Sequence, residues 1–129
     1  MKRFVLLWLP VVVWMGVIFI GSAIGRVPQV GDETLDGLVH RAAHVLEFAV
    51  LGALLLRATS NGRPVSKREI VITLMVIGLY GVGDEFHQRF TPGRNSEGRA
   101  VLFDVAGGAI GVWAWYRWTR RARPREVAD

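Results

Sequence analysis

The sequence predicts an all-α integral membrane protein, a bundle of four transmembrane helices in one domain over residues 1–129, with both termini in the cytoplasm. Of its 129 residues, 51% are hydrophobic and the mean hydropathy is +0.31, more apolar than an ordinary soluble domain. The apolar residues fall into four segments, each near the roughly 20 residues that a membrane-crossing helix needs. Most basic residues flank alternate ends of these segments, as membrane topology requires.

The first predicted helix covers about residues 4–25. It follows two basic residues and carries no charge, so it is long enough to cross the hydrocarbon core. A cleaved signal peptide would also start with basic residues and end in small ones such as Gly21-Ser22-Ala23. We favour a retained helix, because the apolar run exceeds the roughly 7 to 15 residues of a signal core. Ser22 is expected to be a packing residue.

The second predicted helix covers about residues 35–56, and its first half is unusually polar. At about 100° per residue, several of its polar side chains share one face, with Arg41 at the margin. These side chains are Asp36, His40, His44 and Glu47. Lipid would leave them unsatisfied, so this face is expected to look into the bundle or into a water-filled cavity.

Residues 57–68 are predicted to form a loop. They hold Asn61-Gly62 and Arg63-Pro64, which interrupt a helix, and they carry four cations and no acid. The third helix is predicted from about residue 69 to residue 90.

The polar end of this third helix, from Gly83 to Arg94, is the main candidate for a functional site. One face is predicted to hold Tyr80, Asp84, His87 and Gln88. Glu85 and Arg89 lie to one side and are expected to form an i, i+4 ion pair. Ionisable groups at membrane depth are rare unless they pair or serve a site, so this stretch is the default functional hypothesis.

The fourth predicted helix covers about residues 100–118. It carries Asp104 near its start, followed by Gly107-Gly108-xx-Gly111, which would let another helix approach closely. Its second half is rich in aromatic residues typical of a membrane interface. These are Trp113, Trp115, Tyr116 and Trp118.

The distribution of Lys and Arg predicts the orientation. The N-terminus, residues 57–68 and the C-terminal tail hold eleven of the 16 basic residues, and the other side holds five. The positive-inside rule therefore places both termini in the cytoplasm and the two polar clusters toward the outer face.

The composition also limits the partners and the chemistry. A net charge of +5 and a pI of about 10.7 would suit nucleic acid, but the basic residues lie beside apolar segments and no nucleic-acid module is present. We predict a membrane lipid as partner and no nucleic acid. The lack of cysteine excludes disulfides and a cysteine nucleophile. The sequence predicts no oligomeric state.

Three motifs resemble the VanZ-like family of small bacterial membrane proteins. They are Arg41-xx-His44-xx-Glu47-Phe48-xx-Leu51-Gly52, Asp84-Glu85-Phe86-His87-Gln88-xx-Thr91-Pro92-Gly93-Arg94 and Asp104-xx-Gly107-Gly108-xx-Gly111. The resemblance implies a multi-pass protein of the bacterial cell membrane, and the founding member is associated with resistance to the glycopeptide teicoplanin. The chain departs from the family pattern at some positions: Arg41 replaces a frequent Lys, Phe48 a frequent Tyr, Ala100 an expected aspartate and Asp104 a frequent amide.

Three hypotheses follow for the polar residues. The first is an outward-facing cavity that binds an anionic headgroup, because arginine grips phosphate and carboxylate with two parallel hydrogen bonds. The ligand would be a membrane lipid, a lipid-linked cell-wall precursor or a lipoglycopeptide. The ligand-binding residues would be Arg41, His44, Gln88, Arg94 and Asp104.

The second hypothesis is an intramembrane hydrolase or transferase that acts on a lipid-linked substrate. Its catalytic residues would be Glu47, Asp84, Glu85 and His87. A divalent metal such as zinc could be held by His40, His44 and His87, although the His-Glu-xx-His signature of metalloproteases is absent.

The third hypothesis is a structural polar network without a ligand. In it, Arg41 would pair with Glu47 or Asp84, and Arg94 with Asp104 or Glu97, since buried charges need partners.

Overall fold

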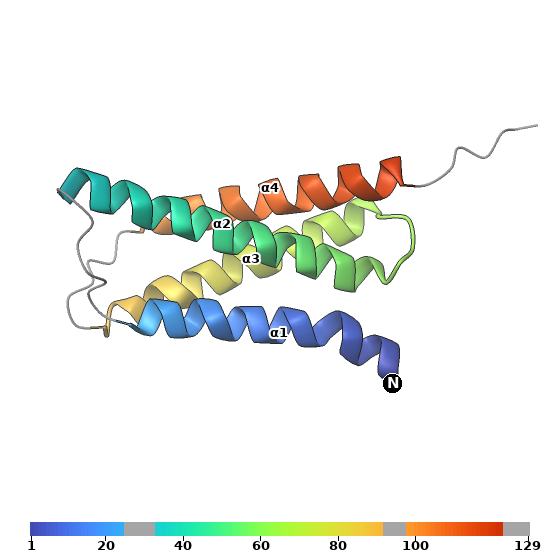
Figure 1. Cartoon of the computed structure of the whole chain (residues 1–129), viewed down its shortest axis with the longest axis horizontal. Helices are drawn as coiled ribbons and strands as arrows, with labels where there is room; N and C mark the ends of the chain where they lie inside the picture. The colour runs from blue at the N-terminus through green and yellow to red at the C-terminus, as the bar shows by residue number, and fades with distance from the viewer. Residues whose placement is uncertain (25–32, 92–97, 123–129) are drawn as a thin grey trace, which may run out of the picture.

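The computed structural model of the chain describes residues 1–24, 33–91 and 98–122, with only the backbone of residues 33, 34 and 36. Within these ranges the chain forms four helices and no strand, which confirms the predicted all-helical fold. The helices are α1 (Lys2–Ala23), α2 (Glu33–Ser60), α3 (Lys67–Gln88) and α4 (Ala100–Arg121). Each helix runs antiparallel to the one before it, so the start of α1 and the end of α4 lie at the same end of the bundle (Figure 1).

The loop predicted over residues 57–68 is shorter than expected. Helix α2 continues to Ser60, because arginine is a good helix former and a cation near a helix C-terminus is favourable. The chain turns only at Asn61 and Gly62, whose φ angles are 50° and 77°. The Arg63 amide closes this turn by donating to the Ser60 carbonyl at 2.9 Å. Two residues at positive φ are typical of a tight reversal of the chain.

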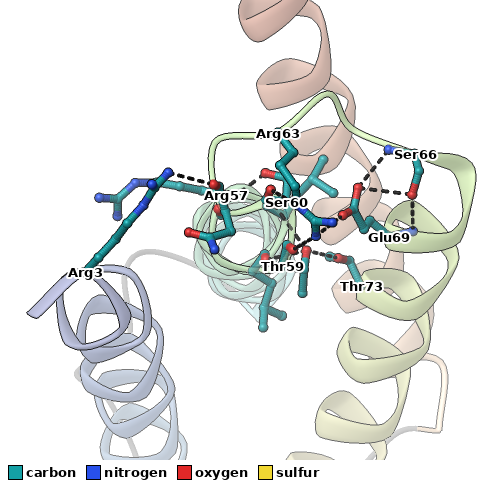
Figure 2. Close-up of polar contacts among 11 residues, drawn as sticks. Arg3, Arg57, Thr59, Ser60, Arg63, Ser66, Glu69 and Thr73 are labelled. Atoms are coloured by element: carbon teal, nitrogen blue, oxygen red, sulfur yellow. Dashed lines mark hydrogen bonds and ion pairs between the residues drawn. The ribbon is translucent and has the colours of Figure 1, made fainter. Parts of the chain in front are cut away.

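Helix α3 begins with a capping box (Figure 2). The Ser66 hydroxyl accepts from the Glu69 amide at 3.3 Å, and the Glu69 carboxylate accepts from the Ser66 amide at 2.8 Å. Both donors would otherwise be unsatisfied at the helix N-terminus, so this pair fixes where α3 starts.

Helices α2 and α3 form the middle of the bundle, and α1 and α4 lie on opposite sides of them (Figure 1). Helix α1 packs against α2 and α3, and α4 packs against the same two helices. Over the described ranges, α1 and α4 make no backbone contact with each other.

The buried apolar core is small and is centred on α2. Phe48, Leu51 and Leu56 of α2 are fully buried and meet Ile18 of α1 and Ile77 of α3. Many other large apolar side chains face outward, especially along α1. A surface of this kind is unfavourable in water and suits lipid.

Three helices are long and apolar enough to cross a membrane: α1, residues Gly37–Ser60 of α2, and α3. Together with this outward-facing apolar surface, they identify a membrane protein. Helix α4 is not among the three, because its glycines, its aromatic residues with polar atoms and its buried aspartate lower its mean hydropathy.

Helices α2 and α4 meet backbone to backbone, as the glycine motif predicted. A Cβ atom on Gly107 would overlap the Val45 carbonyl oxygen, and one on Gly111 would overlap the Ala49 carbonyl oxygen. Small residues allow such close packing of membrane helices. This contact brings the polar halves of α2 and α4 together.

Candidate functional site

Buried polar side chains from all four helices gather in the half of the bundle that is distant from the start of α1 and the end of α4. They come from the end of α1, the first half of α2, the end of α3 and the start of α4, which the antiparallel arrangement places side by side (Figure 1). They are Ser22, His44, Asp84, Glu85, Gln88 and Asp104. We refer to these six residues as the polar cluster.

Asp84 is the centre of the α1–α3 part of the polar cluster. Its Oδ2 accepts from the Ser22 hydroxyl at 2.8 Å and from Gln88 Nε2 at 2.9 Å. The residue is only 3% exposed. Its second oxygen, Oδ1, is buried and has no hydrogen-bond partner in the described part of the chain. The carboxylate is therefore only half satisfied.

The polar face predicted for α3 turns toward α1. Besides Asp84 and Gln88, the Tyr80 hydroxyl donates to the Met15 carbonyl at 2.6 Å, and the His87 ring stacks on Phe19 with its centroid 4.2 Å away. The prediction that these side chains share one face is thus confirmed. Their hydrogen bonds to another helix, and the stacking of His87, reach α1. The Nδ1 atom of His87 is buried and finds no partner within residues 1–24, 33–91 and 98–122.

The α2–α4 part of the polar cluster is a pair between His44 and Asp104. His44 Nδ1 lies 2.9 Å from Asp104 Oδ1, and the two residues are 7% and 1% exposed. With Asp104 ionised, its carboxylate only accepts, and Nδ1 is then the donor in this bond. The Nε2 atom makes no hydrogen bond among the described residues.

Gly81 of α3 allows Asp104 to lie against the third helix. A Cβ atom at this position would sit 3.1 Å from Asp104 Oδ2, which is closer than a normal contact. Asp84 acts electrostatically on both His44 and Asp104, and Glu47 also acts on His44. The two parts of the polar cluster are therefore one electrostatic unit.

The other residues proposed on α2 occupy the edge of this unit. The His40 ring lies 4.9 Å from that of His44, which confirms that the two share a face. Arg41 is exposed, with its guanidinium 5.7 Å from the centroid of the Phe103 ring. Arg41 is thus placed at the rim of the site.

The predicted ion pair between Glu85 and Arg89 is wrong. Glu85 is buried at 5% exposure, whereas Arg89 is exposed and follows the last residue of α3, Gln88. No ion pair joins them among the described contacts.

Some candidates cannot be placed. Arg94 and Glu97, and the side chain of Asp36, lie outside the described residues. The pairs proposed for Arg94 therefore stay predictions.

The described residues do not support the zinc hypothesis. No group of three or more His, Cys, Asp or Glu side chains there could hold a metal ion. His40 and His44 are adjacent, but His44 binds Asp104 and His87 stacks on α1.

Two features of the site were not predicted from the sequence. Ser22 was expected only to pack, yet it is buried at 3% exposure and donates to Asp84. Its signal was that it is the one hydroxyl residue in α1, which carries no charge after Arg3. The pairing of Asp104 with His44 was also missed, because only Arg94 was named as a partner of Asp104.

A family model described as VanZ/LLP1 matches residues 7–119. The match includes all six residues of the polar cluster. Comparison with curated proteins and with solved structures found no match.

Proposed function

Because the chain belongs to the VanZ/LLP1 family, we propose that it acts in the bacterial cell envelope by binding the headgroup of an anionic lipid, or of a lipid-linked envelope ligand, at the polar cluster. The observation that carries this proposal is the half-satisfied carboxylate of Asp84, which is 3% exposed and has one oxygen without a partner among the described residues.

A buried polar atom without a hydrogen bond costs about 1 to 3 kcal/mol, and more for a charged group. A ligand hydroxyl or ammonium group would remove this cost by donating to Asp84 Oδ1. Sugar and glycerol hydroxyls and amino headgroups of envelope lipids all supply such a donor. The ligand therefore carries a hydrogen-bond donor beside its anionic group.

Arginine supports the anionic part of the proposal. Arg41 is exposed beside the polar cluster, and its planar guanidinium suits a phosphate or carboxylate. Arg94, which belongs to the same family-like motif, is the predicted second cation. The acidic and basic groups would then hold opposite parts of one headgroup.

The proposed topology has four transmembrane helices with both termini in the cytoplasm. It is supported by the common end shared by the start of α1 and the end of α4 (Figure 1), together with the basic residues at that end. A phosphatase reporter fused after Asp129 should be inactive, and a fluorescent reporter active. The reverse result would overturn this topology and place the polar cluster on the cytoplasmic side.

The binding proposal is tested with Asp84→Asn. Asparagine keeps one oxygen for Ser22 and Gln88, but turns an NH2 group toward the position that a ligand donor would take. We expect near-normal protein level and unfolding temperature, with several-fold less copurifying anionic lipid by mass spectrometry. Gly83→Ala, beside Asp84 in the chain but with nothing within 4 Å of its added Cβ atom, is the control.

Two results would contradict the binding proposal. Unchanged lipid content in Asp84→Asn would show that no ligand uses this carboxylate. Loss of the folded protein would instead favour a structural polar network as the sole role of the residues.

We also propose a role in resistance to teicoplanin, through binding of a lipid-linked precursor or of the lipoglycopeptide. A susceptible bacterium that expresses the protein should survive higher teicoplanin concentrations, and Asp84→Asn at equal membrane level should remove the gain. If Asp84→Asn gave the same gain in teicoplanin survival, resistance would not depend on the polar cluster.

The His44–Asp104 pair favours a second candidate, an intramembrane hydrolase or transferase. With Asp104 ionised and accepting from Nδ1, Nε2 would be left to accept another proton, as a general base requires. Purified protein would then cleave or transfer a lipid-linked substrate, and His44→Gln would stop turnover while leaving lipid binding in place. Absence of turnover with a panel of such lipids would reject this candidate.

A further inference from the structure

The end of the bundle opposite to the polar cluster contains a cavity of about 310 Å³. It opens between α1 and α4, which make no backbone contact over the described ranges, and the end of α2 and the α2–α3 turn contribute the rest of its lining. The lining includes three guanidinium groups and apolar side chains. These residues are Arg3, Leu7, Arg57, Arg63, Trp115 and Trp118.

Arg57 has the largest unused hydrogen-bonding capacity in this cavity. It is partly buried at the last turn of α2, and its side chain makes no hydrogen bond or ion pair with the described residues. A guanidinium carries five N–H donors. A partly desolvated cation with no partner is a favourable place for an anion.

Arg3 reaches the same cavity from α1. Its Nη2 donates to the Asn61 carbonyl at 2.8 Å, which ties the first helix to the α2–α3 turn (Figure 2). Gly62 makes room for this contact, because a Cβ atom there would lie 2.7 Å from Arg3 Nη2. One bond leaves the other donors of Arg3 available.

Arg63 is already neutralised and is therefore not part of the proposed site. Its Nη2 lies 3.0 Å from Glu69 Oε1 and its Nε donates to the Ser60 carbonyl at 3.3 Å. Glu69 is the only acidic residue among the described residues at this end, and it also caps α3. Arg3 and Arg57 consequently share one cavity in which the described residues leave no carboxylate to balance them.

We propose that this cavity binds a phosphate group, held by Arg57 and Arg3, and that the phosphate belongs to an anionic phospholipid in the leaflet at this end of the protein. Two guanidiniums around one anion match the bidentate geometry of phosphate. Leu7 and Trp118 line the same cavity, and Trp118 is 59% exposed. Tryptophan at headgroup level is typical of a membrane interface, so these walls suit the glycerol and first acyl carbons of a lipid.

The test uses the full-length protein in mixed detergent micelles that contain phosphatidylglycerol or phosphatidylcholine, with bound lipid counted by native mass spectrometry. We expect preferential retention of phosphatidylglycerol. Arg57→Gln should lower this retention roughly tenfold, since a charged hydrogen bond is worth about 1.4 kcal/mol or more. Arg57→Lys keeps the charge but not the planar guanidinium with its paired N–H donors, so this variant should lose part of the phosphatidylglycerol retention.

Arg68→Gln is the matched control, because Arg68 is an exposed cation at the same end that does not line the cavity. Equal losses in Arg57→Gln and Arg68→Gln would show diffuse attraction by charge and overturn the site. Equal retention of the two lipids by the unmodified protein would overturn the phospholipid assignment.

A second arm titrates inorganic phosphate in lipid-free detergent and follows the unfolding temperature. Stabilisation at millimolar phosphate that is absent in Arg57→Gln, without any preference for phosphatidylglycerol, would assign the site to a free phosphate and overturn the lipid. Arg57→Gln should lower phosphatidylglycerol retention by the same factor in an Asp84→Asn background, so failure of this proposal and failure of the binding role of the polar cluster are distinguishable.

Discussion

His44 Nδ1 lies 2.9 Å from Asp104 Oδ1, and this pair joins α2 to α4 at the level where their backbones touch. The contact depends on Gly107, whose missing side chain lets α4 approach the Val45 carbonyl one residue after His44. The close approach of the helices at Gly107 therefore allows His44 to reach Asp104. The described residues show an imidazole as a partner of Asp104, and the suggested pair with Arg94 stays a prediction.

Asp104→Ala should destabilise the protein by about 3 to 5 kcal/mol, because it leaves the His44 ring buried without its partner. Chemical unfolding in detergent, followed by tryptophan fluorescence, measures this loss. Asp104→Asn should cost less, since its amide oxygen can still accept from Nδ1. A double-mutant cycle with His44→Ala isolates the coupling between the two side chains. A coupling energy near zero would contradict the pair.

Gly111→Ala should lower stability by about 1 to 3 kcal/mol, because its methyl group would overlap the Ala49 carbonyl and push α2 and α4 apart. Gly83→Ala is the control, since a Cβ atom there meets nothing within 4 Å. Alanine at that helical position should stabilise the protein slightly, by about 0.5 to 1 kcal/mol. Equal unfolding midpoints for the two variants would argue against backbone contact between the helices.

Ser22→Ala should cost about 1 to 3 kcal/mol, because it removes one of the two donors to Asp84 Oδ2 inside the bundle. Unfolding in detergent measures the change. If Ser22 only filled space, alanine would leave stability unchanged. The loss should shrink in an Asp84→Asn background, where no charge remains to be solvated.

Gly62→Ala should cost about 1 to 2 kcal/mol, because the residue has φ of 77°, a left-handed conformation that disfavours a Cβ atom. The added methyl would also meet Arg3 Nη2. Asn61→Gly, at the neighbouring position with φ of 50°, is the control and should be close to neutral. Removing the Arg3 side chain should reduce the cost of Gly62→Ala. An unchanged cost in the Arg3→Ala background would mean that backbone strain alone explains it.

The family assignment and the all-helical fold could be predicted from the sequence, because both depend on local patterns. Apolar length identified the helices, and the motifs around His44, Asp84 and Asp104 matched the family later found over residues 7–119. The faces of α2 and α3 also followed from helical geometry alone. Helix ends were less accurate, since α2 continues through Arg57 to Ser60.

The sequence by itself determined which residues are polar, which helix each belongs to and which of them share a face. Only the tertiary structure decided the partners: Asp84 bonds Ser22 of α1, and His44 bonds Asp104 of α4. It also decided that glycines of α4 lie against the backbone of α2. The physical reason is that helical periodicity is set by neighbours in the chain, whereas the rotation and depth of each helix are set by side-chain volume at contacts far apart in sequence. Several carboxylates and histidines satisfy the same pattern, so their choice of partner depends on where the small residues let the backbones meet.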